Sequence, residues 1–442
     1  MVTLVSCFFD RNAHESLVNH AEYCRRAGAR HRFEPVAAGA ASLELRIVYK
    51  YQLLCDLMVR AADNELLIFA TENALFLRFD DFESMMAGRD ALVTTGHFGI
   101  NSEIVVLRNT EGNRVIARSM AAKARAYYDY GQFVTEDQLL EALPVQSEAD
   151  SVNERFPIVS ACSTQFPELN ASPIVALSLV FTPRLYSKYG PRWGTTLARH
   201  VNACHASAQR FFEIAPPEGV SAEALSIYQP GQRIAVVMLY TPNIANYACF
   251  GEASLRDYCE QHGYTLYMHR EVPADFAREA CGNWAKPFLL SKYLPHHDWV
   301  FWIDADILAT NRTVKLEDFM EGRERVLSAD IAGWPFNSGV MGFRNTDVNA
   351  RVLQGTLDRI RGLDDLSWTF SNHGDQAHFM FELEANGVLP ARESTELVSF
   401  RELNTPWYYA DQNTFLCHFH GIGSELRMLF MSMKGVPEGG FD

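Results

Sequence analysis

The sequence repeats itself at a long and constant spacing. An Asn-Ser pair at residues 101–102 and an Arg-Asn-Thr triplet at 108–110 recur at 337–338 and 344–346, both with an offset of 236 residues. This period is far above the roughly 20–50 residues of solenoid repeats. The repeat therefore predicts two copies of one whole domain rather than an array of small units.

Weaker pairs keep the same order along the chain at nearby offsets. They are Lys50 with Lys286, Asp137-Gln138 with Asp375-Gln376, and Phe166–Asn170 with Phe400–Asn404. A stretch from Pro216 to Gly231 separates the two sets and contains the Pro and Gly residues of a connection. We predict one domain over residues 1–222 and a second over 223–442. Each half alternates short apolar strands with amphipathic stretches, which is typical of an α/β fold with a mainly parallel sheet.

Charge and hydropathy exclude two classes of partner. The 442 residues carry a formal net charge of −15 and no basic stripe, so we expect no nucleic-acid partner. No run approaches the ~18 apolar residues of a transmembrane segment. The first ten residues lack the basic region and cleavage site of a signal peptide and are predicted as a buried strand. With nine scattered cysteines and no CxxC pair, the chain is expected to be cytoplasmic.

Two acidic residues end a strongly apolar segment in the second half. Trp299–Ile303 has the aromatic and β-branched content of a buried strand, and Asp304 and Asp306 follow it. Alternate strand residues share a face, here at the carboxyl end, where open α/β sheets bind ligands. Two such carboxylates repel each other unless a divalent cation joins them, and their oxygens suit Mg²⁺ or Mn²⁺. The alternative is a solvated pair such as Asp80-Asp81.

Four motifs occur in order over about 120 residues. They are Trp299–Asp306, Asn337-Ser338-Gly339-Val340, Gly374-Asp375-Gln376 and Cys417–Gly421. This set resembles the retaining GT-A glycosyltransferases, and among them family 8 (glycogenin and lipopolysaccharide galactosyltransferases) and family 34 (galactosyl-, mannosyl- and xylosyltransferases). The resemblance implies two tandem GT-A-like, Rossmann-like α/β domains with the active site in the C-terminal half. It also implies a metal-dependent, retaining transfer of a hexose or pentose from a nucleoside-diphosphate sugar, UDP-linked, to a glycan acceptor.

The resemblance further implies roles for individual residues. The metal, Mn²⁺ or alternatively Mg²⁺, would be held by Asp304, Asp306 and His418, and an imidazole ligand favours Mn²⁺. Asp375 and Gln376 would be the catalytic residues at the reacting face of the sugar. The residues implied to bind the donor are Thr241 and Asn243 at the nucleotide, Lys286 at the sugar or phosphate, Asn337 at the sugar, and Gly339 through close approach of its backbone.

One position departs from the family pattern. Family 8 members usually have a Lys after the histidine motif, but Ser424 stands there, and Arg427 is the nearest cation that could bind the departing phosphate. A second histidine, His420, is expected on the same side of a strand as His418 and competes with it for the metal.

Several candidate residues have a plainer alternative. Lys286 could be a solvated helix residue, and Asp375-Gln376 could cap a helix, a position that Asp favours. Asn337-Ser338-Gly339 could form an ordinary turn. The aromatic cluster Trp407-Tyr408-Tyr409 could stack on sugar rings or belong to the core.

The first half lacks the acidic pair. At the position of Asp304 and Asp306 it has Thr71-Glu72-Asn73, and Thr71 and Asn73 place no charge on the strand face. Tight binding of a divalent ion is therefore not expected there. Cys204-His205 is a candidate counterpart of Cys417-His418. We predict a degenerate, non-catalytic first copy, and the alternative is a metal-independent or differently specific transferase.

Two other functions fit parts of the sequence. A carbohydrate-binding pseudoenzyme would not need a set of metal ligands. A sugar-nucleotide nucleotidyltransferase would need a Gly-rich, basic loop after its first strand, which Tyr240–Ala245 does not provide. Sugar transfer therefore fits best, while the donor sugar, the glycan acceptor and the presence of a homo-oligomer stay open.

Overall fold

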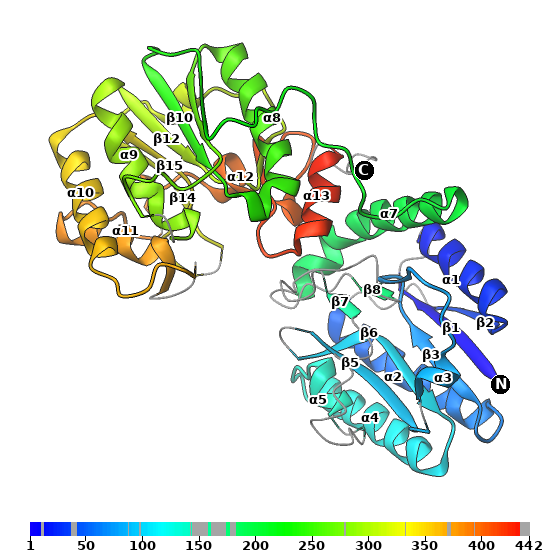
Figure 1. Cartoon of the computed structure of the whole chain (residues 1–442). Coiled ribbons are helices and arrows are strands. Elements are labelled where there is room, and N and C mark those ends of the chain that lie inside the picture. Colours follow the sequence, from blue (N-terminus) through cyan, green and yellow to red (C-terminus); the bar gives the residue numbers. More distant parts are fainter. Residues whose placement is uncertain are drawn as a thin grey trace. The chain divides into compact units, whose positions relative to one another are not determined.

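The structure, a computed structural model, divides the chain into two compact units that we describe separately (Figure 1). Unit 1 comprises Met1–Glu213 with Gly421–Leu426, and unit 2 comprises Ile214–His420 with residues 427–433. The described residues are 1–9, 13–36, 42–86, 88–96, 99–141, 143, 158–160, 174–176, 183–277, 280–331, 333–368, 373–392 and 394–433.

Unit 2 is built around a six-stranded sheet of order β14-β15-β12-β10-β11-β9. Strands β10, β11 and β12 are parallel, and the pairs β9–β11, β12–β15 and β14–β15 are antiparallel. Every residue of the three parallel strands is buried, which explains their nearly continuous apolar sequences. The predicted α/β fold is thereby confirmed. The strands are β9 (Leu225–Tyr228), β10 (Ile234–Leu239), β11 (Thr265–His269), β12 (Trp299–Ile303), β14 (Arg325–Ala329) and β15 (Phe336–Arg344).

Helices cover both faces of this sheet (Figure 1). On one face α9, α10 and α11 share a core with Val237, Trp302 and Phe343. Helix α8 lies on the other face, because the crossover from β10 to β11 and the crossover from β11 back to β12 run in opposite directions across the sheet, and right-handed crossovers then place their helices on opposite sides. The helices are α8 (Ala245–His262), α9 (Lys286–Tyr293), α10 (Asp347–Arg361), α11 (Gly374–Ala385), α12 (Phe400–Leu403) and α13 (Ser424–Ser432), with short 3-10 helices at Pro242–Ile244, Gly282–Ala285, Leu294–His296, Leu316–Phe319 and Trp407–Tyr409.

A small second sheet of order β13-β17-β16 completes unit 2. It is formed by β13 (Ile307–Ala309), β16 (Thr405–Pro406) and β17 (Leu416–His418). Because β13 follows β12 after only three residues, this sheet brings a segment from the end of the chain beside the carboxyl edge of the main sheet.

Unit 1 has a five-stranded sheet of order β2-β1-β3-β6-β5 and a small sheet of order β4-β8-β7. The larger sheet has the same order and strand directions as β11-β10-β12-β15-β14 in unit 2. The strands are β1 (Val2–Phe8), β2 (Arg30–Pro35), β3 (Leu66–Ala70), β4 (Ala74–Phe76), β5 (Ala91–Gly96), β6 (Gly99–Arg108), β7 (Ile158–Ser160) and β8 (Ile174–Ala176). The helices are α1 (His14–Ala27), α2 (Leu43–Arg60), α3 (Phe82–Met86), α4 (Glu111–Asp129), α5 (Glu136–Leu140) and α7 (Pro183–Ser207).

The two main sheets also share a bulge. In unit 2 the pairing of β15 with β14 passes from Met341 to Asn337, so residues 338–340 have no partner on β14. In unit 1 residues 102–104 of β6 have none on β5. A bulge of this kind changes the direction in which side chains point and is frequent beside functional sites.

The structure corrects one predicted correspondence between the halves. Cys204 and His205 lie on helix α7, whereas Cys417 and His418 lie on strand β17, so these pairs do not correspond. The repeat segment Phe166–Asn170 lies outside the described residues.

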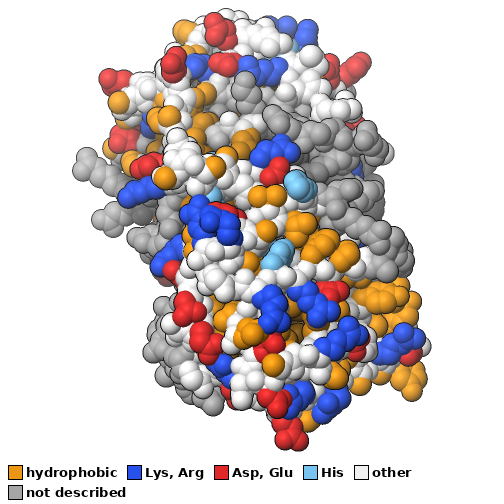
Figure 2. Space-filling view, turned by 90° about the vertical axis from the view of Figure 1, so that its right-hand side faces the viewer, with side chains coloured by type: hydrophobic (Ala, Val, Ile, Leu, Met, Phe, Trp, Pro, Cys, Tyr) orange, Lys and Arg blue, Asp and Glu red, His pale blue; other side chains and the backbone are white. Residues whose placement is uncertain are grey.

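Surface and helix composition bear on the expected partners. Within the described residues, the helices are all too short or too polar to cross a lipid bilayer. On the face in Figure 2, basic side chains of the described residues lie among acidic ones.

Candidate metal and donor site

The acidic pair of unit 2 lies in a turn at the carboxyl end of β12. We predicted that the strand would run through the pair, but β12 ends at Ile303 and β13 begins at Ile307. The Asp304 N–H donates to the Gly339 carbonyl oxygen at 2.9 Å, and the Asp306 carbonyl oxygen accepts from the Phe419 N–H at 2.9 Å. The turn is thus fixed by one backbone bond to each sheet.

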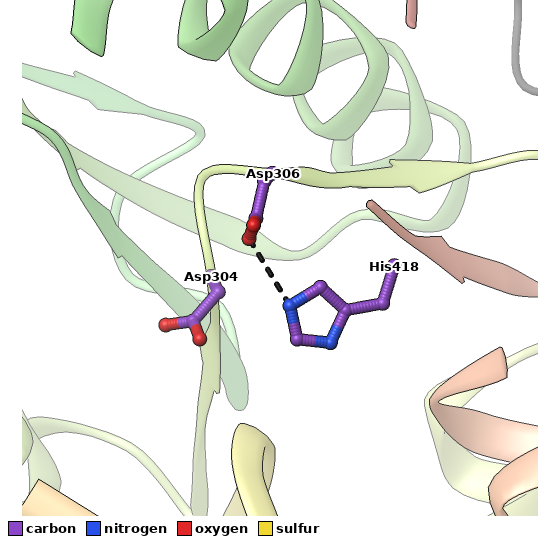
Figure 3. A group of neighbouring side chains, drawn as sticks. All are labelled: Asp304, Asp306 and His418. Atoms are coloured by element: carbon purple, nitrogen blue, oxygen red, sulfur yellow. Dashed lines mark ion pairs between the residues drawn. The ribbon is translucent and has the colours of Figure 1, made fainter. Parts of the chain in front are cut away.

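The third predicted ligand, His418, faces this turn. It is the last residue of β17 and pairs with Ile307 across the small sheet. Figure 3 shows the side chains of Asp306 and His418 pointing toward each other, with Asp304 beside them. Each of these three residues offers one ligand atom, and these atoms lie within 4.8 Å of one another. Among the described residues, this is the one group of three side chains that could hold a metal ion. The structure thus brings together the three residues that the family resemblance implies as metal ligands, and their role stays a prediction.

The distance between the imidazole and the carboxylate suits a shared cation. The His418 Nε2 atom lies 3.1 Å from the Asp306 Oδ1 atom. Neighbouring ligands of an octahedral ion bound at about 2.1 Å are about 3 Å apart. Two carboxylates and one imidazole also form a donor set that suits Mn²⁺. The three side chains therefore fit the implied metal.

The competing histidine, His420, is outside this group. Burial and the neighbouring His418 lower the pKa of His420 to about 3. The two imidazole rings are 5.0 Å apart between centroids. Of the two candidates, only His418 has a ring nitrogen among the grouped ligand atoms of the described residues.

The carboxylates differ in their charged neighbours. Burial would raise the pKa of Asp306, but His418 and Arg427 outweigh it and hold this pKa well below its usual range. Burial raises the pKa of Asp304, and Lys286 offsets only part of that rise. Trp302 also donates its indole N–H to Asp304 Oδ1 at 2.7 Å.

Lys286 joins the acidic turn to helix α11. Its Nζ atom lies 2.9 Å from Asp304 Oδ1 and 3.1 Å from Asp375 Oδ2, and the side chain is 2% exposed. The interpretation of Lys286 as a solvated helix residue is therefore wrong. Burial would lower the pKa of this amine, but the two carboxylates raise it above its usual value. Lys286 is thus a buried, charged link between the two carboxylates.

Asp375 and Gln376 both bind the bulge of β15. The Ser338 hydroxyl donates to Asp375 Oδ2 at 2.9 Å, and the Ser338 N–H donates to Gln376 Oε1 at 2.9 Å. His373, not Asp375, stands at the N-cap of α11. Helix capping therefore does not explain Asp375, which lies in the first turn and is buried.

Asn337 and Gly339 lie on strand β15, close to His418. The Gly339 N–H donates to Asn337 Oδ1 at 2.9 Å, and Asn404 Nδ2 donates to the same oxygen at 2.8 Å. A Cβ atom on Gly339 would lie 2.6 Å from His418 Cε1, closer than such contacts are found. The absence of a side chain at Gly339 thus makes room for the His418 ring. The predicted contact between the Gly339 backbone and a sugar donor stays a prediction.

Arg427 approaches the acidic turn from helix α13. Its Nη1 atom lies 3.4 Å from Asp306 Oδ2 and donates to the Tyr247 hydroxyl at 2.8 Å. Its guanidinium also lies over the Tyr247 ring, 4.6 Å from the centroid. The predicted phosphate-binding cation is therefore beside the metal group.

The remaining candidates lie at the edge of the site or in the core. Thr241 and Asn243 follow β10, where the Thr241 hydroxyl donates to Asn243 Oδ1. Trp407 and Tyr409 are buried, as expected for core residues, and Tyr408 is half-buried.

Four residues of this site carry no predicted role. Ser338 and Asn404 stand inside the repeated sequence pairs, and this repetition could have pointed to them. Tyr247 and Asp330 have no comparable signal, because their contacts come from distant parts of the chain.

The sheet and its helices form a GT-A type of α/β fold, and comparison with known families agrees with this class. More particularly, residues 249–332 match the galactosyl transferase GMA12/MNN10 family. This segment includes α8, β12, Asp304 and Asp306. The match confirms the resemblance to family 34 and supports assignment of the chain as a glycosyltransferase. A search of curated proteins found no match to the chain.

A search of solved structures found partial matches to glycosyltransferases. One is involved in the glycosylation of the major capsid of PBCV-1, with 16% identity, a TM-score of 0.35, and coverage of 45% of this chain and 98% of that one. The galactosyltransferase LgtC, solved with donor and acceptor sugar analogues, has 14% identity, a TM-score of 0.28, and coverage of 42% and 87%. A Drosophila β-1,4-galactosyltransferase 7 mutant, solved with manganese, UDP-Gal and xylobiose, has 13% identity, a TM-score of 0.27, and coverage of 43% and 71%.

Proposed function

We propose that unit 2 is a metal-dependent, retaining glycosyltransferase that moves a sugar from a UDP-linked donor to a glycan acceptor. The observation that carries the proposal is the grouping of Asp304, Asp306 and His418, whose ligand atoms lie within 4.8 Å of one another, at the carboxyl ends of the parallel strands of the main sheet. That edge is where open α/β sheets bind nucleotides. The cytoplasmic location and the domain boundaries 1–222 and 223–442 are part of the proposal.

In this proposal, Asp304, Asp306 and His418 would hold Mn²⁺, which would supply Lewis-acid stabilisation of negative charge on the departing diphosphate. Lys286 keeps Asp304 and Asp375 in place and balances their charge. Arg427 supplies a second cation beside the diphosphate. Thr241 and Asn243 lie against the nucleotide, and Asn337 and Gly339 border the sugar.

Asp375 and Gln376 serve the sugar end of the reaction. Their bonds to Ser338 hold both side chains against the bulge of β15. From there the Asp375 carboxylate and the Gln376 amide stabilise the positive charge that develops on the sugar ring as its bond to phosphate breaks, by analogy with glycoside hydrolysis.

The test is turnover of UDP-sugars by the purified protein. We expect release of UDP that requires Mn²⁺ and stops with a chelator. Asp306→Asn should lower the rate by about 100-fold or more, because it removes one metal ligand. The matched control is Asp298→Asn: Asp298 precedes the amino end of the same strand, is paired with Arg233 on the surface, and should leave the rate unchanged.

Other products would support the other functions. Release of pyrophosphate from UTP and a sugar 1-phosphate, which together form a UDP-sugar, would indicate a nucleotidyltransferase. Saturable glycan binding without any turnover would indicate a carbohydrate-binding pseudoenzyme. A product anomer opposite to that of the donor would overturn retention while leaving sugar transfer in place.

We also propose that unit 1 is a degenerate copy of unit 2. Supporting this, Lys50 of unit 1 donates to the Ser102 carbonyl oxygen and pairs with Glu136, whose other oxygen accepts from the Ser102 hydroxyl. Lys286, Ser338 and Asp375 make the same three contacts in unit 2. The bulges of the two sheets hold the serines.

The cation-binding part of the copy differs. Glu103 stands 236 residues before Gly339, which is the offset of the repeat. Its carboxylate accepts from the Thr71 hydroxyl and, at 3.4 Å, from Asn73 Nδ2. Thr71 and Asn73 stand 233 residues before Asp304 and Asp306, close to the offset of the repeat. In unit 1 a carboxylate that accepts from two neutral side chains thus stands where unit 2 has its two acids, which supports a first copy that holds no divalent cation tightly.

A further inference from the structure

Asn404 holds the His418 ring in one position. Asn404 is 4% exposed and stands between α12 and β16. Its side-chain oxygen lies 2.9 Å from His418 Nδ1, and its side-chain nitrogen donates to Asn337 Oδ1 at 2.8 Å. Asn404 itself is not among the three grouped ligands.

The direction of each bond follows from a backbone N–H. The Gly339 N–H can only donate, so the Asn337 atom that it contacts, 2.9 Å away, is the amide oxygen. The Asn404 atom facing that oxygen must then be its NH₂ group. Asn337 Nδ2 in turn donates to Asp330 Oδ1 at 3.3 Å, which agrees with this orientation.

The orientation of Asn404 fixes the proton on the imidazole. With its NH₂ group directed at Asn337, Asn404 presents its oxygen to His418 Nδ1. An amide oxygen only accepts, so Nδ1 carries a hydrogen. In the neutral ring Nε2 then has the free lone pair, and Nε2 is the atom that faces Asp306 at 3.1 Å.

We propose that Asn404 is a positioning residue that keeps His418 Nε2 available as a metal ligand, through the hydrogen-bonded series Gly339–Asn337–Asn404–His418. The inference rests on the proposed metal site but assigns a role to a residue outside it. Hydrogen-bond partners of metal-bound histidines commonly fix the ring in this way, and their loss costs about 10–100-fold in metal affinity.

The experiment measures Mn²⁺ affinity by electron paramagnetic resonance without a sugar donor. Asn404→Leu removes both bonds at similar volume, and we expect a 10–100-fold weaker affinity. Asn404→Asp keeps an acceptor for Nδ1 and should stay within a few-fold of the unchanged protein. The matched control is Thr405→Val, since Thr405 is equally buried, is adjacent, and bonds only to the Arg401 carbonyl oxygen among described contacts.

The outcomes separate this inference from the function itself. If the unchanged protein binds Mn²⁺ and Asn404→Leu binds it equally well, the positioning role is wrong and the metal site stands. If Asn404→Leu and Thr405→Val weaken binding equally, the effect is general loss of packing and the role is also wrong. If the unchanged protein binds no Mn²⁺, the metal site and the role of Asn404 both fall.

Discussion

Single residues at the site show what a motif can reveal. Asp304 and Asp306 were predicted as a pair because an apolar strand that ends in paired acids has a narrow range of uses, whereas His418 was implied only by the family resemblance. The bonds of Asn404 and the packing of Gly339 against His418 could not be predicted, since they depend on which side chains three distant segments bring together. Lys286 was ambiguous for the same reason.

Replacing Lys286 tests its role as a buried link. Lys286→Met would leave the buried Asp375 carboxylate and the half-buried Asp304 carboxylate without their shared cation, and we expect a loss of about 3–5 kcal/mol in the free energy of unfolding. The control is Lys292→Met on the same helix, whose exposed pair with Asp275 should contribute less than about 1 kcal/mol. Urea unfolding measures both, and similar losses would contradict the prediction.

A buried histidine in unit 1 should make the protein sensitive to acid. Burial lowers the pKa of His20 to about 4, while its backbone bond to Ala74 opposes the shift. The unfolded chain, with a histidine pKa of about 6.5, therefore binds more protons between these values. The stabilisation is complete above pH 6.5 and is lost as the pH falls toward 4.

The size of this effect can be measured by urea unfolding. Between pH 7.5 and pH 5 His20 should account for a loss of about 2 kcal/mol. His20→Gln should remove that part of the pH dependence. Identical pH profiles for the variant and the unchanged protein would show that His20 does not carry the effect.

At the scale of elements, strands and helices were easier to predict than their ends. The apolar run from Trp299 to Leu308 resembles one long strand, but only its first half pairs in the main sheet. The second half pairs with β17, more than 100 residues away in sequence, and this pairing bends the chain at Asp304–Asp306. Local pattern contains no information about such a partner.

The close packing of α8 on this turn gives a prediction. A Cβ atom on Gly251 would lie 2.5 Å from the Ala305 carbonyl oxygen. Gly251→Ala should therefore lower the melting temperature and weaken Mn²⁺ binding, although alanine favours a helix by about 1 kcal/mol. Gly112→Ala on α4 has open space and should not destabilise the protein. Unchanged Mn²⁺ affinity in Gly251→Ala would show that the turn tolerates the shift.

At the scale of the whole molecule, the two units should differ in metal binding. The described residues contain one group of three metal-ligand side chains, all in unit 2. We expect one tightly bound Mn²⁺ per chain, counted by titration, and none after combining Asp304→Asn with Asp306→Asn. A second equivalent, or retention of one in the double variant, would contradict the assignment of unit 1 as the degenerate copy.

The internal repeat could be predicted from the whole sequence, because the matching segments keep their order even where their sequence identity is low. The position of Glu103 beside Thr71 and Asn73 could not be predicted, since the Thr-Glu-Asn segment alone does not show which residue lies next to it. Its partner comes from β6, more than 30 residues away.

The bulge at residues 338–340 of unit 2 and at 102–104 of unit 1 limits which sequence changes each sheet can accept. Ser338 and Ser102 reach their partners because three residues leave the ladder at the same point in each sheet. Deleting one of them would turn every following side chain to the opposite side. A substitution in this segment can therefore change the chemistry while the neighbouring side chains keep their direction, as with Gly339 in unit 2 and Glu103 in unit 1, whereas an insertion or deletion cannot.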